Sequence, residues 1–106
     1  INVSWRIEGT NLDLYLVFSE DNEDVQVFGR FLNVPENKVD VMYKACNECN
    51  RKYRWAKFTV VDDKISVESD AVIQLDSCAE EVTGYMIRLT KIVEAAYPIL
   101  MKAMWG

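Results

Sequence analysis

The sequence contains no histidine, and this absence removes several kinds of chemistry at once. No side chain is left whose ordinary pKa lies near neutral pH, and the most common nitrogen ligand of zinc is missing. Nucleophiles that depend on a histidine base are excluded for the same reason. The four glycines are scattered, so no glycine-rich loop is available to hold a phosphate group. We therefore expect a protein that is not an enzyme, with no catalytic residues and no cofactor.

Long apolar runs are missing as well. No stretch comes near the roughly 20 apolar residues that a membrane-spanning helix needs, and no signal-peptide pattern opens the chain. Basic residues are outnumbered, with 12 lysines and arginines against 17 acids, and the net charge of −5 repels polyanions. The 106 residues, half of them hydrophobic, suffice for one self-supporting core. We expect a single domain over residues 1–106, located in the cytoplasm, with no membrane and no nucleic-acid partner.

Cysteine is scarce and odd in number, since the chain has only Cys46, Cys49 and Cys78. A secreted domain of this size more often has an even, disulfide-paired set, so reduced thiols in the cytoplasm are expected. The CxxC spacing of Cys46 and Cys49 could hold a metal or form a redox pair, but zinc needs four ligands and the sequence offers three thiols. We therefore expect core thiols and no metal site. A metal- or redox-responsive switch built on the three cysteines is the alternative function.

Four stretches of the chain alternate apolar and polar residues with a period of two, which is typical of half-buried strands. They are residues 2–8, 12–18, 25–32 and 65–74, and residues 54–61 are rich in the aromatic and β-branched residues that favour strands. Polar or acidic turns separate the stretches within each group, and Asp62-Asp63 joins the last two. Short connections predict antiparallel pairing, so we expect a three-stranded meander followed later by a hairpin.

Two other stretches repeat their apolar residues at helical spacing. The first follows Pro35, which suits the first turn of a helix. Its predicted apolar face consists of Val39, Met42, Tyr43, Cys46 and Asn50. The second follows Ser77, which with Glu80 predicts a capping box, and Pro98 is expected to kink or split it. The order βββ-α-ββ-α predicts an α+β fold, a five-stranded antiparallel sheet with helices packed on it.

Asn50 and the stretch that follows it combine polar groups with apolar neighbours. A buried Asn50 amide must be hydrogen-bonded, and we expect its partners to be backbone groups left free at the helix end. Residues 51–58 interleave cations with aromatics, a composition typical of single-stranded nucleic-acid platforms. A nucleic-acid binder is a weaker alternative function, because the chain is acidic overall. Its candidate contacts are Arg51, Lys52, Arg54 and Lys57.

Residues 45–51, Ala-Cys-Asn-Glu-Cys-Asn-Arg, followed by Tyr53 and Lys57-Phe58, resemble the YbjN family of bacterial sensory transduction regulators. In that family, pairs of an apolar residue and an asparagine recur three residues apart, before a strand with a lysine followed by an aromatic. The acidic hairpin and the long closing helix are also similar. The chain departs from the family pattern at its CxxC cysteines, where the family has aliphatic residues, and this supports their interpretation as core thiols.

The resemblance implies a fold similar to type III secretion chaperones, which start with an additional N-terminal helix. This chain begins at Ile1 without that helix, so we expect a segment to precede it. The resemblance also implies no catalytic residues and no cofactor. We expect a non-catalytic protein-interaction module that is a sensory transduction regulator or a chaperone-like protein.

Apolar residues beyond those needed for the core predict an interaction surface. We expect four of them on the sheet face opposite the helices and three in the tail after Pro98. The seven residues are Tyr15, Val17, Phe28, Trp55, Leu100, Met104 and Trp105. Part of this surface is expected to lie under the N-terminal helix that the resemblance implies. The remainder predicts a homodimer or a docked protein partner.

Overall fold

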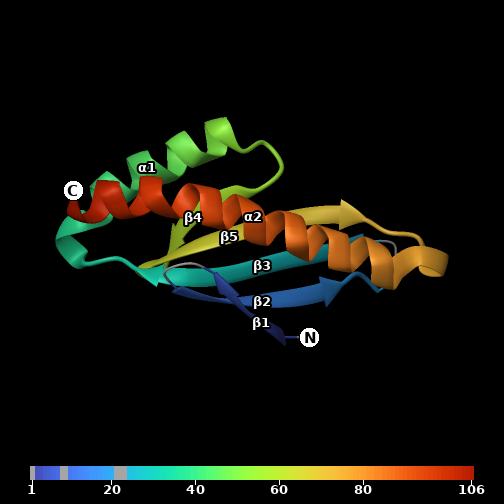
Figure 1. The fold of residues 1–106 in the computed structure, drawn as a ribbon. Helices are drawn as coiled ribbons and strands as arrows, with labels where there is room; N and C mark the ends of the chain where they lie inside the picture. The colour runs from blue at the N-terminus through green and yellow to red at the C-terminus, as the bar shows by residue number, and fades with distance from the viewer. Residues whose placement is uncertain (1, 8–9, 21–23) are drawn as a thin grey trace.

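A computed structural model of the chain describes residues 2–7, 10–20 and 24–106 (Figure 1). The elements in chain order are β1 (Asn2–Ile7), β2 (Thr10–Phe18), β3 (Asp24–Asn33), η1 (Glu36–Lys38), α1 (Val39–Lys52), β4 (Lys57–Val61), β5 (Lys64–Val72), η2 (Leu75–Ser77) and α2 (Cys78–Trp105). The strands form one sheet in the order β1-β2-β3-β5-β4, and every neighbouring pair is antiparallel. The prediction of an α+β fold with two helices packed on an antiparallel sheet is confirmed.

The core lies between the sheet and the helices, and the period-two pattern decides which strand residues reach it. In β2 the side chains of Leu12, Leu14 and Leu16 are buried, whereas the residues between them are exposed. Val25 and Val27 continue the same buried face on β3. In β1 the same alternation predicts that Val3, Trp5 and Ile7 are buried. The structure describes the backbone of these three residues but not their side chains, so this prediction lies outside the described part of the chain.

The β4–β5 hairpin closes on the predicted Asp62-Asp63 turn. Both residues have positive φ angles, 50° and 63°, and Val61 pairs directly with Lys64. These angles define a type I′ turn, whose twist matches that of the strands it joins. The two adjacent acids therefore have a structural role as turn residues.

The buried face of α1 is rotated from the face that the sequence predicted. Its buried residues are Met42, Ala45, Cys46 and Cys49. Tyr43 is 55% exposed, so its predicted place in the core is wrong. Successive residues of a helix are about 100° apart, and Tyr43 therefore lies a quarter turn away from Met42 and outside the buried stripe.

The start of α2 also differs from the prediction, because Ser77 and Glu80 do not form a capping box. The Ser77 hydroxyl donates to the Glu81 carboxylate at 2.9 Å, and the other oxygen of that carboxylate accepts the backbone N–H of Gln74 at 2.9 Å. The short 3-10 turn of η2 comes directly before α2. The free backbone N–H that the Glu81 carboxylate accepts is therefore that of Gln74, at the start of this turn, and not one in the first turn of α2.

Pro98 does not split α2, which runs without interruption from Cys78 to Trp105. Proline removes one helical hydrogen bond, the one to the carbonyl of Glu94. Both residues are exposed, so water can replace the lost donor. Beyond the proline, Leu100 and Met104 are almost completely buried and hold the last turns against the core.

The molecule is elongated, with extents of 46 × 24 × 23 Å, because α2 runs along the sheet (Figure 1). This helix contacts α1 and strands β1, β3 and β5, while α1 packs against β4. No helix in the described part of the chain is both long and apolar enough to cross a membrane.

Candidate functional site

One face of the sheet has no helix over it among the described residues, because α2 and the core occupy the other face (Figure 1). The residues that point to this side alternate with the core residues along each strand. We call this the open sheet face. Its residues on β2 to β5 are Asp13, Tyr15, Val17, Asp24, Gln26, Phe28, Arg30, Lys57, Thr59, Lys64, Ser66, Glu68, Asp70 and Val72.

An aromatic pair lies at the centre of the open sheet face. Tyr15 and Phe28 are directly opposite each other in the β2–β3 register, and their rings stack with centroids 5.4 Å apart. Val17 is the next residue on the same side of β2 and is 51% exposed, and Val72 on β5 is 72% exposed. Three of the seven predicted surface residues, Tyr15, Val17 and Phe28, are therefore together as expected.

The charges on the open sheet face are only partly separated along the strand direction. Asp24 and Asp70 lie toward one end of the strands, beyond the aromatic pair. Arg30 and Lys64 lie toward the other end, where Asp13 is directly opposite Arg30 in the β2–β3 register. Arg30 also contacts Asp62 of the hairpin turn at 3.9 Å, where both side chains are largely exposed. An exposed pair of this kind contributes little to stability. One end of the face is therefore acidic, whereas cations and carboxylates are mixed at the other end, with the aromatic pair between them.

The other four predicted surface residues do not lie on the open sheet face. Leu100 and Met104 are 0% and 1% exposed, so their predicted place on a surface is wrong: α2 continues through Pro98 and turns them into the core. Trp105 is exposed, but on the helix that covers the opposite face. Trp55 stands beside α2, with its ring 5.9 Å from that of Tyr85.

Asn50 fills a specific place at the outer edge of the sheet. The Nδ2 group donates to the Phe58 carbonyl at 2.9 Å, and Oδ1 accepts the Phe58 N–H. In the β4–β5 register the backbone groups of Phe58 point away from β5, so the amide pairs with β4 as a neighbouring strand would. The amide is hydrogen-bonded as predicted, but its partners belong to β4 and not to the helix end.

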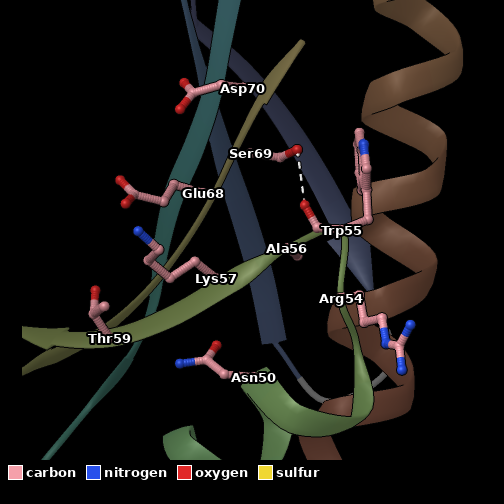
Figure 2. A pocket seen from close by; sticks show the side chains of 9 residues that line it. All are labelled: Asn50, Arg54, Trp55, Ala56, Lys57, Thr59, Glu68, Ser69 and Asp70. Atoms are coloured by element: carbon pink, nitrogen blue, oxygen red, sulfur yellow. Dashed lines mark hydrogen bonds between the residues drawn. The ribbon is translucent and has the colours of Figure 1, made fainter.

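Figure 2 shows the pocket of about 450 Å³ at this edge. Lys57, Glu68 and Asp70 project to the open-face side, whereas Arg54 and the Trp55 ring lie on the side of α2 (Figure 2). The Ser69 hydroxyl donates to the Trp55 carbonyl at 3.1 Å and so fixes the chain between the two sides. The basic stretch of residues 51–58 is therefore divided by its own backbone and does not form one continuous patch.

A second hollow of about 530 Å³ lies between the end of α1 and the middle of α2. We call it the basic groove. Its lining residues are Lys52, Tyr53, Arg54, Trp55, Arg88, Lys91, Ile92 and Ala95. Four of the eight are cations and none is acidic.

Sequence reasoning missed Arg88 and Lys91 as members of this groove. Their three-residue spacing on the closing helix is visible in the sequence and places both on one side of α2. Only the packing of α2 beside the end of α1 brings them opposite Lys52 and Arg54.

The thiols of the CxxC pair are core groups, as predicted. Cys46 and Cys49 are 4% and 0% exposed, whereas Cys78 is partly exposed. Burial raises the pKa of each of the two buried thiols from 9.0 to about 11. The neighbouring Cys49 raises the pKa of Cys46 further. At Cys49, the Glu48 carboxylate raises the pKa further and the Lys52 ammonium partly lowers it. Within the described residues, no cluster of cysteine and carboxylate groups is arranged to hold a metal ion.

Comparison with known protein families places these features in context. Residues 2–88 match the family model YbjN, described as "Putative bacterial sensory transduction regulator". The chain belongs to the YbjN family. The match covers the whole sheet, α1 and the first part of α2, so it includes the open sheet face, Asn50 and Arg88. No curated protein and no solved structure gave a significant match.

Proposed function

We propose that this YbjN-family chain is a non-catalytic protein-interaction module, a sensory transduction regulator of the bacterial cytoplasm that self-associates through its open sheet face. The observation that carries the proposal is the stacked pair of an exposed Tyr15 and a partly exposed Phe28, on a sheet face that has no helix over it among the described residues. Aromatic residues are enriched at protein interfaces, because they bury a large area at a small cost in side-chain entropy.

The arrangement of charges favours a second copy of the chain as the occupant. In a twofold face-to-face dimer whose axis runs across the strands near the aromatic pair, the end with Asp24 and Asp70 lies opposite the partner's end with Arg30 and Lys64. The aromatic centres then meet, and these opposed charges attract, although Asp13 and Asp62 beside Arg30 offset part of the attraction. A twofold interface also closes on itself and produces a dimer instead of an open filament.

Sedimentation of the chain over a range of micromolar concentrations tests the proposal. We expect a monomer–dimer equilibrium that high salt weakens, because the opposed charges are screened. Tyr15→Glu should shift it to monomer without unfolding the chain, since the side chain is 40% exposed. Tyr43→Glu is the matched control, because Tyr43 is an exposed tyrosine on α1, away from the open sheet face, and should leave the dimer intact.

Three results would contradict the proposal. One is a strict monomer at every concentration, and another is a dimer that Tyr15→Glu and Tyr43→Glu weaken equally. The third is a dimer that becomes monomeric when a preceding segment is attached, which would assign the face to that segment.

A further inference from the structure

The basic groove combines charge and planar apolar surface in a way that the proposed self-association does not use. We propose that it binds a nucleotide, with the phosphate groups held by its four cations and the ring of the base packed against its aromatic and aliphatic wall. The site lies beside α2, on the opposite side of the sheet from the open sheet face.

The four cations come from two separate elements. Lys52 and Arg54 belong to the end of α1 and the loop after it, whereas Arg88 and Lys91 project from the middle of α2. Lys52 also suits the negative end of the α1 dipole, but Arg88 and Lys91 have no such role in their helix. Cations that converge from two elements are expected where an anion is to be bound.

These cations have no acidic partners in the part of the chain that the structure describes. Two of them lie against rings instead: Arg88 is 5.0 Å from the centre of the Trp55 ring, and Lys52 is 5.6 Å from that of Tyr53. A cation–π contact positions a cation without neutralising it. The groove therefore keeps its positive charge available, although the whole chain carries −5.

The size and charge of the site favour a small ligand. A hollow of about 530 Å³ lies within the range of small-molecule sites, roughly 300–1,000 Å³. Local cations act strongly within the Debye length of about 8 Å, so a compact anion responds to them. A long nucleic acid would also meet the acidic remainder of the surface. Guanidinium groups such as those of Arg54 and Arg88 can bind phosphate oxygens in pairs.

The planar surface distinguishes a nucleotide from a simple phosphate. Trp55, Ile92 and Ala95 form a wall between the cations, and the Arg88 guanidinium lies over the Trp55 ring. A base can therefore stack on the Arg88 guanidinium plane, which Trp55 supports from behind, with Ile92 and Ala95 at its edge. Stacking of this kind contributes enough to favour a nucleotide over a phosphate without a ring by about tenfold.

Equilibrium titration at low salt tests the inference, with ATP, pyrophosphate, adenosine, a single-stranded oligonucleotide and polyglutamate as separate probes. We expect ATP to bind about tenfold more tightly than pyrophosphate, and adenosine to bind weakly. Arg88→Gln should weaken ATP binding at least about tenfold, because it removes a charged hydrogen-bond donor. Lys44→Gln is the matched control and should have no effect, since Lys44 is exposed on α1 and lies neither in the basic groove nor on the open sheet face.

Equal binding of ATP and pyrophosphate would mean a simple anion site and would overturn the inference. Binding of only the oligonucleotide or only polyglutamate would also overturn it, in favour of a nucleic-acid or acidic-peptide site. Equal loss in Arg88→Gln and Lys44→Gln would show binding through net charge alone and would overturn the inference. Both variants replace exposed side chains, so their folding should be unchanged, and the dimer measured by sedimentation reports separately on the proposed function.

Discussion

At the scale of single residues, the Asn50 amide satisfies the outward-facing backbone groups of the edge strand β4. Its two hydrogen bonds to Phe58 replace the strand that would otherwise pair there. An edge strand with free backbone N–H and carbonyl groups can pair with a strand of another chain, which leads to aggregation. Asn50 therefore serves both stability and protection of the edge.

Asn50→Leu should lower the free energy of unfolding by about 1–3 kcal/mol, because it leaves the N–H and carbonyl of Phe58 without partners. Denaturant unfolding measures this loss. Asn47→Leu is the control, since Asn47 is exposed on the same helix and should change stability little. The folded Asn50→Leu protein should still form the dimer. A variant of normal stability that has lost self-association would instead place Asn50 in a binding site.

The two buried thiols predict a specific dependence of stability on pH. Their folded-state pKa is about 11 against an ordinary value of 9.0, so the unfolded chain loses these protons first as the pH rises. Stability should therefore be unaffected below about pH 9 and should fall between about pH 9 and 11. In the double variant Cys46→Ala, Cys49→Ala this part of the loss should disappear.

The same double variant should cost about 1–3 kcal/mol at neutral pH through the cavities it leaves. Metal analysis of the purified protein should find negligible zinc, and a chelator should not shift the melting temperature. One zinc ion per chain would contradict the core interpretation of Cys46 and Cys49 and favour the metal switch.

At the scale of elements, two glycines show how the same residue type has opposite roles. A Cβ atom on Gly29 in β3 would come within 2.6 Å of the Asp13 carbonyl oxygen, a backbone atom of β2 that cannot move alone. A Cβ atom on Gly84 in α2 would meet nothing within 4 Å. The first glycine permits close strand contact, and the second only weakens its helix.

Gly29→Ala should therefore destabilise the protein by about 1–3 kcal/mol through overpacking. Gly84→Ala should stabilise it by about 0.5–1 kcal/mol, because alanine loses less backbone entropy in a helix than glycine. Thermal unfolding of both variants and of the parent chain shows whether each substitution raises or lowers the stability. A neutral Gly29→Ala would mean that β2 and β3 can separate slightly at no cost.

At the scale of the whole molecule, one hydrophobic core joins the sheet to the full length of α2. The family match ends at residue 88, but the buried face of the helix continues through Val93 and Leu100 to Met104. The last third of α2 is therefore part of the folding unit and not a separate tail.

Leu100→Ala should cost about 2–5 kcal/mol, the usual loss for a large buried side chain. Trp105→Ala should change stability by less than about 0.5 kcal/mol, because the Trp105 side chain is 64% exposed at the end of the helix. Urea unfolding of both variants tests whether the tail belongs to the core. Equal small effects would show that the helix beyond Pro98 contributes nothing to the fold.

Local patterns in the sequence were enough to predict the α+β class, the antiparallel sheet, the Asp62-Asp63 turn and the buried thiols. These features depend on neighbours within a few residues: apolar periodicity, turn residues and the ligand number that zinc requires. The sequence also predicted that Tyr15, Val17 and Phe28 share a face, because alternation along paired strands fixes the side to which each points.

Only the tertiary structure decided the features that depend on distant packing. It placed Leu100 and Met104 in the core, because the stability of a helix beyond a proline depends on what its last turns pack against. It gave Asn50 a strand as its partner and brought Arg88 opposite Arg54, which are 34 positions apart in the chain. Such contacts are set by how elements are placed in space, and neither periodicity nor local spacing carries that information.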